Sequence, residues 1–303
     1  IIVAIIAVVA VGAFFLMGSG DTVTIGYLPS DHDAALFVAD AQGQFASNGI
    51  KTNLVQFNNG GDLMTAMASG DVDVGYVGIT PVLASIQKEV PVKVISAAQT
   101  DGSGLVVSKN SGISSVQDLA GKSIATPGEA SIQYMLLQYY LEQNGMSLKD
   151  LKVSSMKVPS MNDALKTNKI DGMITFEPYV TIAEKNGATV LAGSQDILPD
   201  HPCCVVVASD KFLEEHPNET NTILKIHENA TNFINNNSDE AASMIPSDIV
   251  SDVEVEKVAI SSFPFISGLD DSFKQDVMDF MNLEVDLGVL KQPISQDKIF
   301  WRS

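Results

Sequence analysis

One order of apolar and helical segments occurs twice in this sequence, and this duplication constrains the fold more than any other feature. The first copy has apolar runs at 23–27 and 51–57 and helical patterns at 34–47 and 63–68. The second copy has apolar runs at 123–126 and 152–158 and helical patterns at 131–143 and 161–166. The copies match most closely where Asn48-Gly49-Ile50 corresponds to Asn144-Gly145-Met146, and Val72-Asp73-Val74 to Ile170-Asp171-Gly172.

Each copy is predicted to form a βαβαβ unit. Strands that alternate with helices indicate an α/β fold with doubly wound, mostly parallel sheets and right-handed crossovers. Further apolar runs at 92–97 and 104–107 leave the first copy, and the run at 203–207 returns to it. The sequence therefore predicts two lobes joined by a hinge of two crossing segments, near 98–104 and 199–203.

The predicted domain organisation follows from these crossings. Residues 21–103 form the first part of lobe 1, and residues 104–200 form lobe 2. Residues 201–303 return to lobe 1 and add helices expected at 221–235, 239–245, 251–261 and 272–287, packed chiefly on lobe 1. A chain of 303 residues is long enough to give both lobes a buried core.

The composition is that of a folded, strongly acidic protein. Hydrophobic residues make up 45% and charged residues 18%, and the formal net charge is −19. This balance is typical of globular rather than disordered chains. Because phosphate binding needs a basic face, the charge argues against a nucleic-acid or anionic-membrane surface.

The first seventeen residues are apolar and uncharged. A bilayer span needs about 17–25 such residues, whereas the core of a signal peptide has about 7–15. We expect residues 1–20 to be a membrane anchor, with a removed signal as the alternative. The rest of the chain is then extracytoplasmic, at the cell surface or in the periplasm, and contacts the membrane only through this segment.

The two cysteines, Cys203 and Cys204, are adjacent. Neighbouring cysteines cannot join distant parts of a chain, so no disulfide framework is predicted. We interpret them as two small hydrophobic residues at the start of the strand 203–207, with a strained vicinal disulfide as the alternative.

A set of short motifs resembles a known family. The motifs are Gly26-Tyr27-Leu28-Pro29, Gly43 with Phe45 and Gly49-Ile50, Gly70-Asp71-Val72-Asp73, Lys169-Ile170-Asp171 and Glu177-Pro178. Together, over roughly 22–215, they resemble the nitrate/sulfonate/taurine-type solute-binding proteins of ATP-driven importers. The resemblance implies a type II periplasmic-binding-protein fold, a small ligand between the lobes, and importer permease subunits as partners. Bicarbonate, riboflavin and thiamine-pyrimidine binders belong to the same family, so the resemblance does not fix the ligand.

Ligands of open α/β sheets bind beyond the carboxyl ends of the strands. This rule selects six loops, at 28–33, 58–62, 78–81, 126–131, 159–162 and 176–179. Several of them precede a helix, where unpaired N–H groups favour an anion. The predicted ligand-binding residues are Ser30, Asp31, His32, Gly60, Gly61, Gly78, Thr80, Gly128, Ser131, Glu177 and Tyr179.

Several of these residues also have a purely structural interpretation. Ser30 and Ser131 could serve only as helix caps, the glycines could mark turns, and Asp31 could be a first-turn helix acid. None of the six loops contains Lys or Arg. The ligand is therefore either an anion held by neutral donors and helix dipoles, or a molecule whose cationic end faces a carboxylate such as Glu177 or Asp62.

No nucleophile–base arrangement or phosphate loop stands out, and the four histidines have no metal-ligand spacing. We expect a monomeric binding protein, not an enzyme, with no cofactor and no metal. The expected ligand is a small organic anion such as an alkanesulfonate or taurine. The alternatives are a nitrate or bicarbonate binder, a thiamine-pyrimidine or riboflavin binder, and, from another class, an enzyme like those that make the thiamine pyrimidine.

Overall fold

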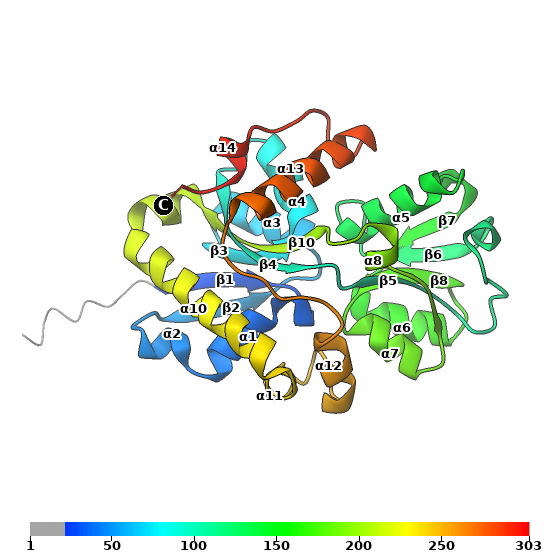
Figure 1. Cartoon of the computed structure of the whole chain (residues 1–303), viewed down its shortest axis with the longest axis horizontal. Helices are drawn as coiled ribbons and strands as arrows, with labels where there is room; N and C mark the ends of the chain where they lie inside the picture. The colour runs from blue at the N-terminus through cyan, green and yellow to red at the C-terminus, as the bar shows by residue number, and fades with distance from the viewer. Residues whose placement is uncertain (1–21, 303) are drawn as a thin grey trace, which may run out of the picture.

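A computed structural model describes residues 22–302, so the anchor predicted at 1–20 lies outside the described residues. Two five-stranded sheets form two lobes that lie side by side (Figure 1). The sheet of lobe 1 has the order β2-β1-β3-β10-β4 and that of lobe 2 the order β7-β6-β8-β5-β9. The strands are β1 (Val23–Tyr27), β2 (Thr52–Gln56), β3 (Val74–Gly78), β4 (Val92–Thr100), β5 (Ser103–Val107), β6 (Ser123–Thr126), β7 (Lys152–Ser155), β8 (Gly172–Phe176), β9 (Thr189–Gly193) and β10 (Pro202–Ser209).

The two sheets share one topology, as the duplication predicts. In lobe 1, β1 pairs in parallel with β2 and β3, and in lobe 2, β6 pairs in parallel with β7 and β8. The fourth strand of each sheet, β10 or β5, is antiparallel to both of its neighbours. Each of these is the strand that the chain forms immediately after it crosses from the other lobe. The sheets are therefore mixed, with a parallel βαβαβ unit in each.

Helices cover both sheets. Lobe 1 carries α1 (Ala34–Ala41), α2 (Gln44–Ser47), α3 (Gly60–Ser69) and α4 (Ile79–Gln87), and lobe 2 carries α5 (Ile132–Gln143), α6 (Val158–Lys166), α7 (Tyr179–Lys185) and α8 (Ser194–Ile197). The C-terminal region adds α9 (Asp210–Glu215), α10 (Pro217–Asn236), α11 (Ser238–Ala242), α12 (Val253–Ile260), α13 (Asp271–Asp286) and α14 (Gln296–Ile299). Three short 3₁₀ helices are η1 (Asp31–Asp33), η2 (Val116–Leu119) and η3 (Leu148–Asp150).

Two sequence expectations about helices need correction. The helix expected at 34–47 is broken into α1 and α2, because Gly43 adopts a left-handed conformation with φ 65°. The expected loop residues Gly60 and Gly61 are the first turn of α3, which begins early because the Asn59 side chain accepts a hydrogen bond from the N–H of Asp62. Among the C-terminal helices, α12 also contacts α7 of lobe 2.

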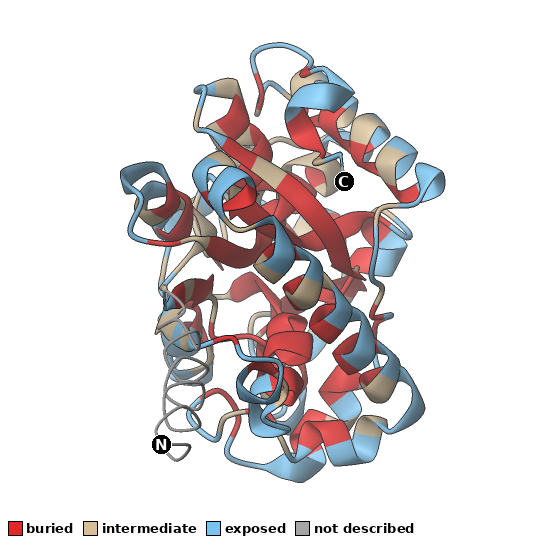
Figure 2. Ribbon diagram, turned by 90° about the vertical axis from the view of Figure 1, so that its left-hand side faces the viewer, coloured by how far each residue is buried: buried red, intermediate tan, exposed pale blue. Residues whose placement is uncertain are grey.

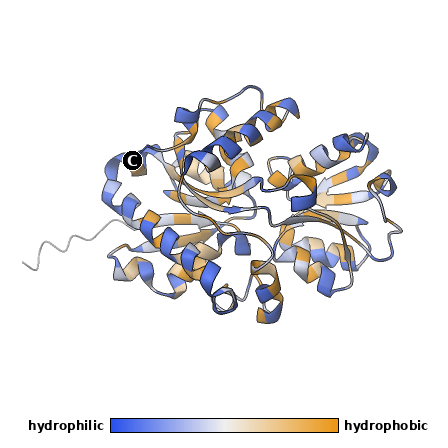
Figure 3. Ribbon diagram, viewed as in Figure 1, coloured by the Kyte–Doolittle hydropathy of each residue, from blue (hydrophilic) through white to orange (hydrophobic). Residues whose placement is uncertain are grey.

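The central strands of each sheet are buried, whereas the edge strands β2 and β7 and the outer helix faces are more exposed (Figure 2). Along the helices, apolar residues face the sheets and polar residues face outward (Figure 3). One cluster of buried apolar residues extends across both lobes. It includes Ile79 of α4 in lobe 1 and Ile132 of α5 in lobe 2. The lobes thus contact each other beside the site described below. Within the described residues, no helix is both long and apolar enough to cross a membrane.

Candidate ligand-binding cleft

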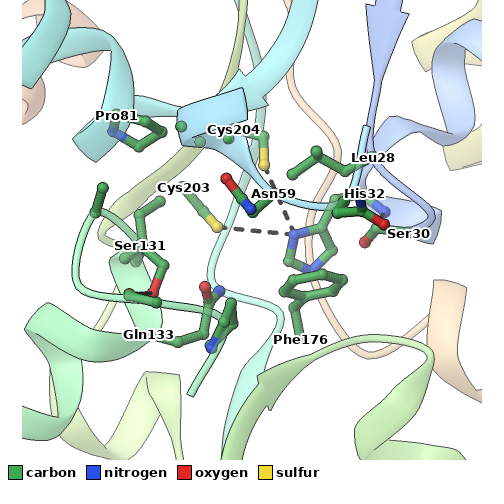
Figure 4. A pocket seen from close by; sticks show the side chains of 18 of the residues that line it. Leu28, Ser30, His32, Asn59, Pro81, Ser131, Gln133, Phe176, Cys203 and Cys204 are labelled. Atoms are coloured by element: carbon green, nitrogen blue, oxygen red, sulfur yellow. Dashed lines mark hydrogen bonds between the residues drawn. The ribbon is translucent and has the colours of Figure 1, made fainter. Parts of the chain in front are cut away.

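A cavity of about 280 Å³ lies between the lobes. Figure 4 shows the side chains that converge on it from both sides. This volume is close to the lower end of the range for small-molecule sites, about 300–1,000 Å³. The lining residues are Leu28, Ser30, His32, Asp33, Asn58, Asn59, Gly60, Gly61, Gly78, Pro81, Pro127, Gly128, Glu129, Ala130, Ser131, Ile132, Gln133, Ser155, Phe176, Cys203 and Cys204.

Three helices begin at the cavity wall: α3 and α4 from lobe 1 and α5 from lobe 2. The first N–H groups of a helix have no acceptor within the helix, and they carry a partial positive charge. The close approach of α3 to α4 requires glycine at position 60, because a Cβ there would lie 2.6 Å from Cγ of Pro81. The cavity is thus surrounded by several N–H donors that are fixed in place by the helices.

The two serine hydroxyls predicted to bind ligand are already engaged in capping. Ser30 Oγ accepts from the N–H of His32 and donates to the carbonyl of Glu177, at 2.8 Å across the cleft. Ser131 Oγ accepts from the N–H of Tyr134 and donates to the carbonyl of Gly128. These hydroxyls therefore hold the cavity wall in place, and Ser30 also joins the two lobes.

The acidic residues in the lining do not give it a strong negative charge. The carboxyl group of Asp33 is buried, and this burial raises its pKa well above the usual value, although the N–H of Leu28 donates to it at 2.8 Å. Glu129 is exposed to solvent at the rim. No Lys or Arg is among the lining residues that the structure describes. An anion would therefore meet mainly backbone N–H groups and neutral side chains.

His32 lies against both cysteine thiols in the cavity wall. Its Nδ1 is 3.8 Å from Sγ of Cys203 and 3.7 Å from Sγ of Cys204, and its Nε2 is 2.9 Å from the carbonyl oxygen of Gly102. Both cysteines are free. Burial opposes ionisation of Cys203, but the Cys204 thiol and the His32 imidazole outweigh it and lower the pKa of Cys203 well below its usual value.

Seven of the eleven predicted site residues line this cavity: Ser30, His32, Gly60, Gly61, Gly78, Gly128 and Ser131. The other four, Asp31, Thr80, Glu177 and Tyr179, lie outside the lining. All four are buried among protein groups. The loop 159–162 contributes no lining residue, and Ser155 at the end of β7 lies there instead.

The four residues outside the lining have other partners. The Thr80 hydroxyl donates to the carboxyl group of Glu284 on α13. The Glu177 carboxyl accepts from the N–H and hydroxyl of Thr181, each at 3.0 Å, and so caps α7. Asp31 is buried, and its pKa is raised well above the usual value by burial and then by Glu256 and Glu177. The ring of Tyr179 packs on that of Phe176, with centroids 5.9 Å apart.

Sequence reasoning missed the lining residues Asn58, Asn59, Gln133 and Ser155 and the cysteine pair. Asn58 and Asn59 follow a predicted strand and precede a helix within a selected loop, so the amide side chains were a usable signal. Gln133 lies inside the predicted helix at 131–143, and its first-turn position was the available clue. The cysteines lie on the antiparallel strand β10, which the rule about parallel strands does not cover.

Known proteins with similar sequences include several binding proteins and one synthase. It is 32% identical to the taurine-binding periplasmic protein of Escherichia coli, over 64% of this chain and 61% of that protein. It is 29% identical to a putative aliphatic sulfonates-binding protein of Bacillus subtilis, over 78% of this chain and 73% of that protein. A pyrimidine phosphate synthase of Uromyces fabae is also similar, 26% identical over 67% of this chain and 63% of that protein.

The fold is that of the alkanesulfonate-binding protein of Xanthomonas axonopodis, with a TM-score of 0.82 at 16% identity over 93% of this chain and 98% of the other. At this identity the likeness establishes the two-lobed binding-protein fold alone. The model of the NMT1-like family matches residues 19–246, which include all of lobe 2 and most of lobe 1. The chain is therefore a member of the NMT1-like family.

Proposed function

We propose that this protein is the extracytoplasmic solute-binding component of an ABC importer and that its cleft captures a small sulfonate. The observation that carries the proposal is the convergence of three helix N-termini on a small interlobe cavity whose described lining has no cationic side chain. Each helix N-terminus stabilises a nearby anion by about 0.3–1 kcal/mol at an exposed site, and by up to about 2 kcal/mol at a partly buried one. Similarity to taurine- and sulfonate-binding proteins supports the sulfonate class.

The sulfonate oxygens would accept hydrogen bonds from the N–H groups at the starts of α3 and α5, near Gly61 and Ile132.

A cationic end of the ligand would have fewer carboxylate partners than the sequence suggested. Glu177 caps α7, and Asp62 is exposed outside the lining, where it accepts from the Asn59 amide. Among the acids of the lining, only Glu129 at the rim is exposed to solvent. An amine such as that of taurine would point toward this rim.

The proposed role is binding and delivery without chemistry. The partners are the permease subunits of the importer, and we propose that the apolar segment 1–17 anchors a monomeric protein to the membrane. Lobe closure about the segments near Asp101 and His201 would enclose the solute, because the chain crosses between the sheets only at these segments among the described residues.

A thermal-shift panel tests the ligand class. Taurine, alkanesulfonates, nitrate, bicarbonate, riboflavin and an aminopyrimidine are compared at equal concentrations. A ligand at about 100 times its dissociation constant adds about 2.7 kcal/mol of stability. We expect a sulfonate to raise the melting temperature most and to reduce the radius of gyration in X-ray scattering. Stabilisation by the aminopyrimidine alone would contradict the sulfonate assignment.

A further inference from the structure

The cavity wall contains a cluster of three potential metal ligands that the proposed solute-binding function does not use. Nδ1 of His32 and the Sγ atoms of Cys203 and Cys204 all lie within 4.8 Å of one another. All three side chains are buried, with 3%, 1% and 6% of their residues exposed, and all three line the cavity. Figure 4 shows both thiols directed at the same ring nitrogen.

Two adjacent cysteines in a regular strand would point to opposite faces of the sheet. Here the pairing of β10 with β4 is irregular between Pro202 and Cys204, and again between Cys204 and Val205. Such a bulge re-aims a side chain. The local backbone thus directs both thiols to one imidazole, which simple packing of two small hydrophobic residues would not require.

The orientation of the His32 ring is also fixed for ligation. The carbonyl oxygen of Gly102 can only accept, so the Nε2 atom 2.9 Å away carries the hydrogen. In the neutral ring Nδ1 then has a free lone pair, directed at the thiols. A backbone carbonyl that holds the second ring nitrogen is the usual outer partner of a metal-binding histidine.

The distances match those of ligands that share one ion. Metal–sulfur bonds of about 2.3 Å and metal–nitrogen bonds of about 2.0 Å place S and N about 3.5 Å apart at tetrahedral angles and about 3.7 Å apart at trigonal angles. The two observed separations are 3.8 and 3.7 Å. Both nitrogen–sulfur separations are thus compatible with a shared ion, and the two sulfur atoms lie within 4.8 Å of each other.

We propose that His32, Cys203 and Cys204 form a binding site for one thiophilic metal ion in the cleft wall. Two sulfur ligands and an imidazole select soft ions, of which Cu(I) suits three trigonal ligands and Zn(II) would take a fourth ligand from the cavity. The site lies beside the space proposed for the solute, so a bound ion would contact that solute. The site does not depend on the sulfonate assignment.

Metal titration of the reduced protein, without solute and without oxygen, tests this site. Cu(I) is titrated in competition with a chromophoric chelator, and Zn(II) in competition with a fluorescent one. We expect one equivalent of at least one ion to bind. X-ray absorption of that complex should show two sulfur neighbours and one nitrogen neighbour from the protein. Failure of both ions to bind would overturn the proposal.

Substitutions then assign the ligands. His32→Gln, Cys203→Ser and Cys204→Ser should each weaken binding by about 100-fold or more, while His216→Gln should not, because His216 lies outside the cavity lining. Equal affinity in all four variants would contradict the assignment. If a variant misfolds, the rate of thiol alkylation in the unaltered protein tests the site instead. The bound ion should protect both thiols from alkylation. An alkylation rate that the ion does not change would count against the site.

Discussion

Asp101 and His201 join the two segments that cross between the lobes. The N–H of Asp101 donates to the carbonyl oxygen of His201 at 3.2 Å, and Oδ1 of Asp101 lies 3.2 Å from Nδ1 of His201. Burial alone would lower the pKa of His201, but Asp101 and the Cys203 thiol outweigh it and raise this pKa to about 9. The protonated imidazole and the carboxylate therefore form an ion pair at the hinge.

The stability of the protein should consequently depend on pH through His201. Its folded pKa of about 9 lies above the ordinary 6.5, so the stabilisation is fully present below pH 6.5 and is lost as the pH rises through 9. Asp101→Asn should lower the free energy of unfolding by about 1–3 kcal/mol at pH 6 and by less at pH 10. Urea unfolding at both pH values measures this difference, and a loss of equal size at both would contradict the ion pair.

Glu284 should give a second pH dependence. It is buried, and this burial raises its pKa to about 8, although the Thr80 hydroxyl donates to it. Because the folded pKa exceeds the ordinary 4.5, its contribution to stability is present below pH 4.5 and is lost as the pH rises through 8. Glu284→Gln keeps an acceptor for Thr80 and removes the charge. We expect its stability relative to the unaltered protein to increase by about 3–4 kcal/mol between pH 5 and pH 8.

Glu228→Gln is the matched control, because Glu228 lies exposed on α10. Its stability relative to the unaltered protein should stay constant over the same range. A constant difference for Glu284→Gln as well would show that Glu284 is ionised in the folded protein at neutral pH.

The absence of a side chain at Gly78 should allow the two lobes to close on the solute. A Cβ at this position would lie 3.1 Å from Cδ1 of Ile132, which belongs to the other lobe. Overpacking of such a contact costs about 1–3 kcal/mol, so Gly78→Val should weaken solute binding by about 10- to 100-fold. Ala68→Val, at an exposed position on α3, should leave the affinity unchanged. Normal affinity in Gly78→Val would show that the lobes do not close on this contact.

The βαβαβ order of elements in each lobe and most of the loops at the cavity could be predicted, because the duplication repeats this order and parallel strands place their carboxyl ends together. The partners of Thr80 and Asp31 could not be predicted from the sequence. Thr80 is covered by Glu284 on α13 and Asp31 faces Glu256 on α12, and both helices come from the C-terminal region, which has no counterpart in the duplicated units. The proposed role of the cysteines depends on a bulge in β10. A sequence pattern of alternating apolar and polar residues does not reveal such a bulge.

Calorimetric titration of the protein with taurine and with a simple alkanesulfonate tests the central claim most directly. Convergent helix ends can support a dissociation constant in the micromolar range, about −8 kcal/mol. We predict one-to-one binding of at least one sulfonate at this affinity or tighter, weakened in Gly78→Val and retained in Ala68→Val. The absence of binding heat for every sulfonate, together with binding of nitrate, bicarbonate or an aminopyrimidine, would contradict the assignment of this cleft to sulfonates.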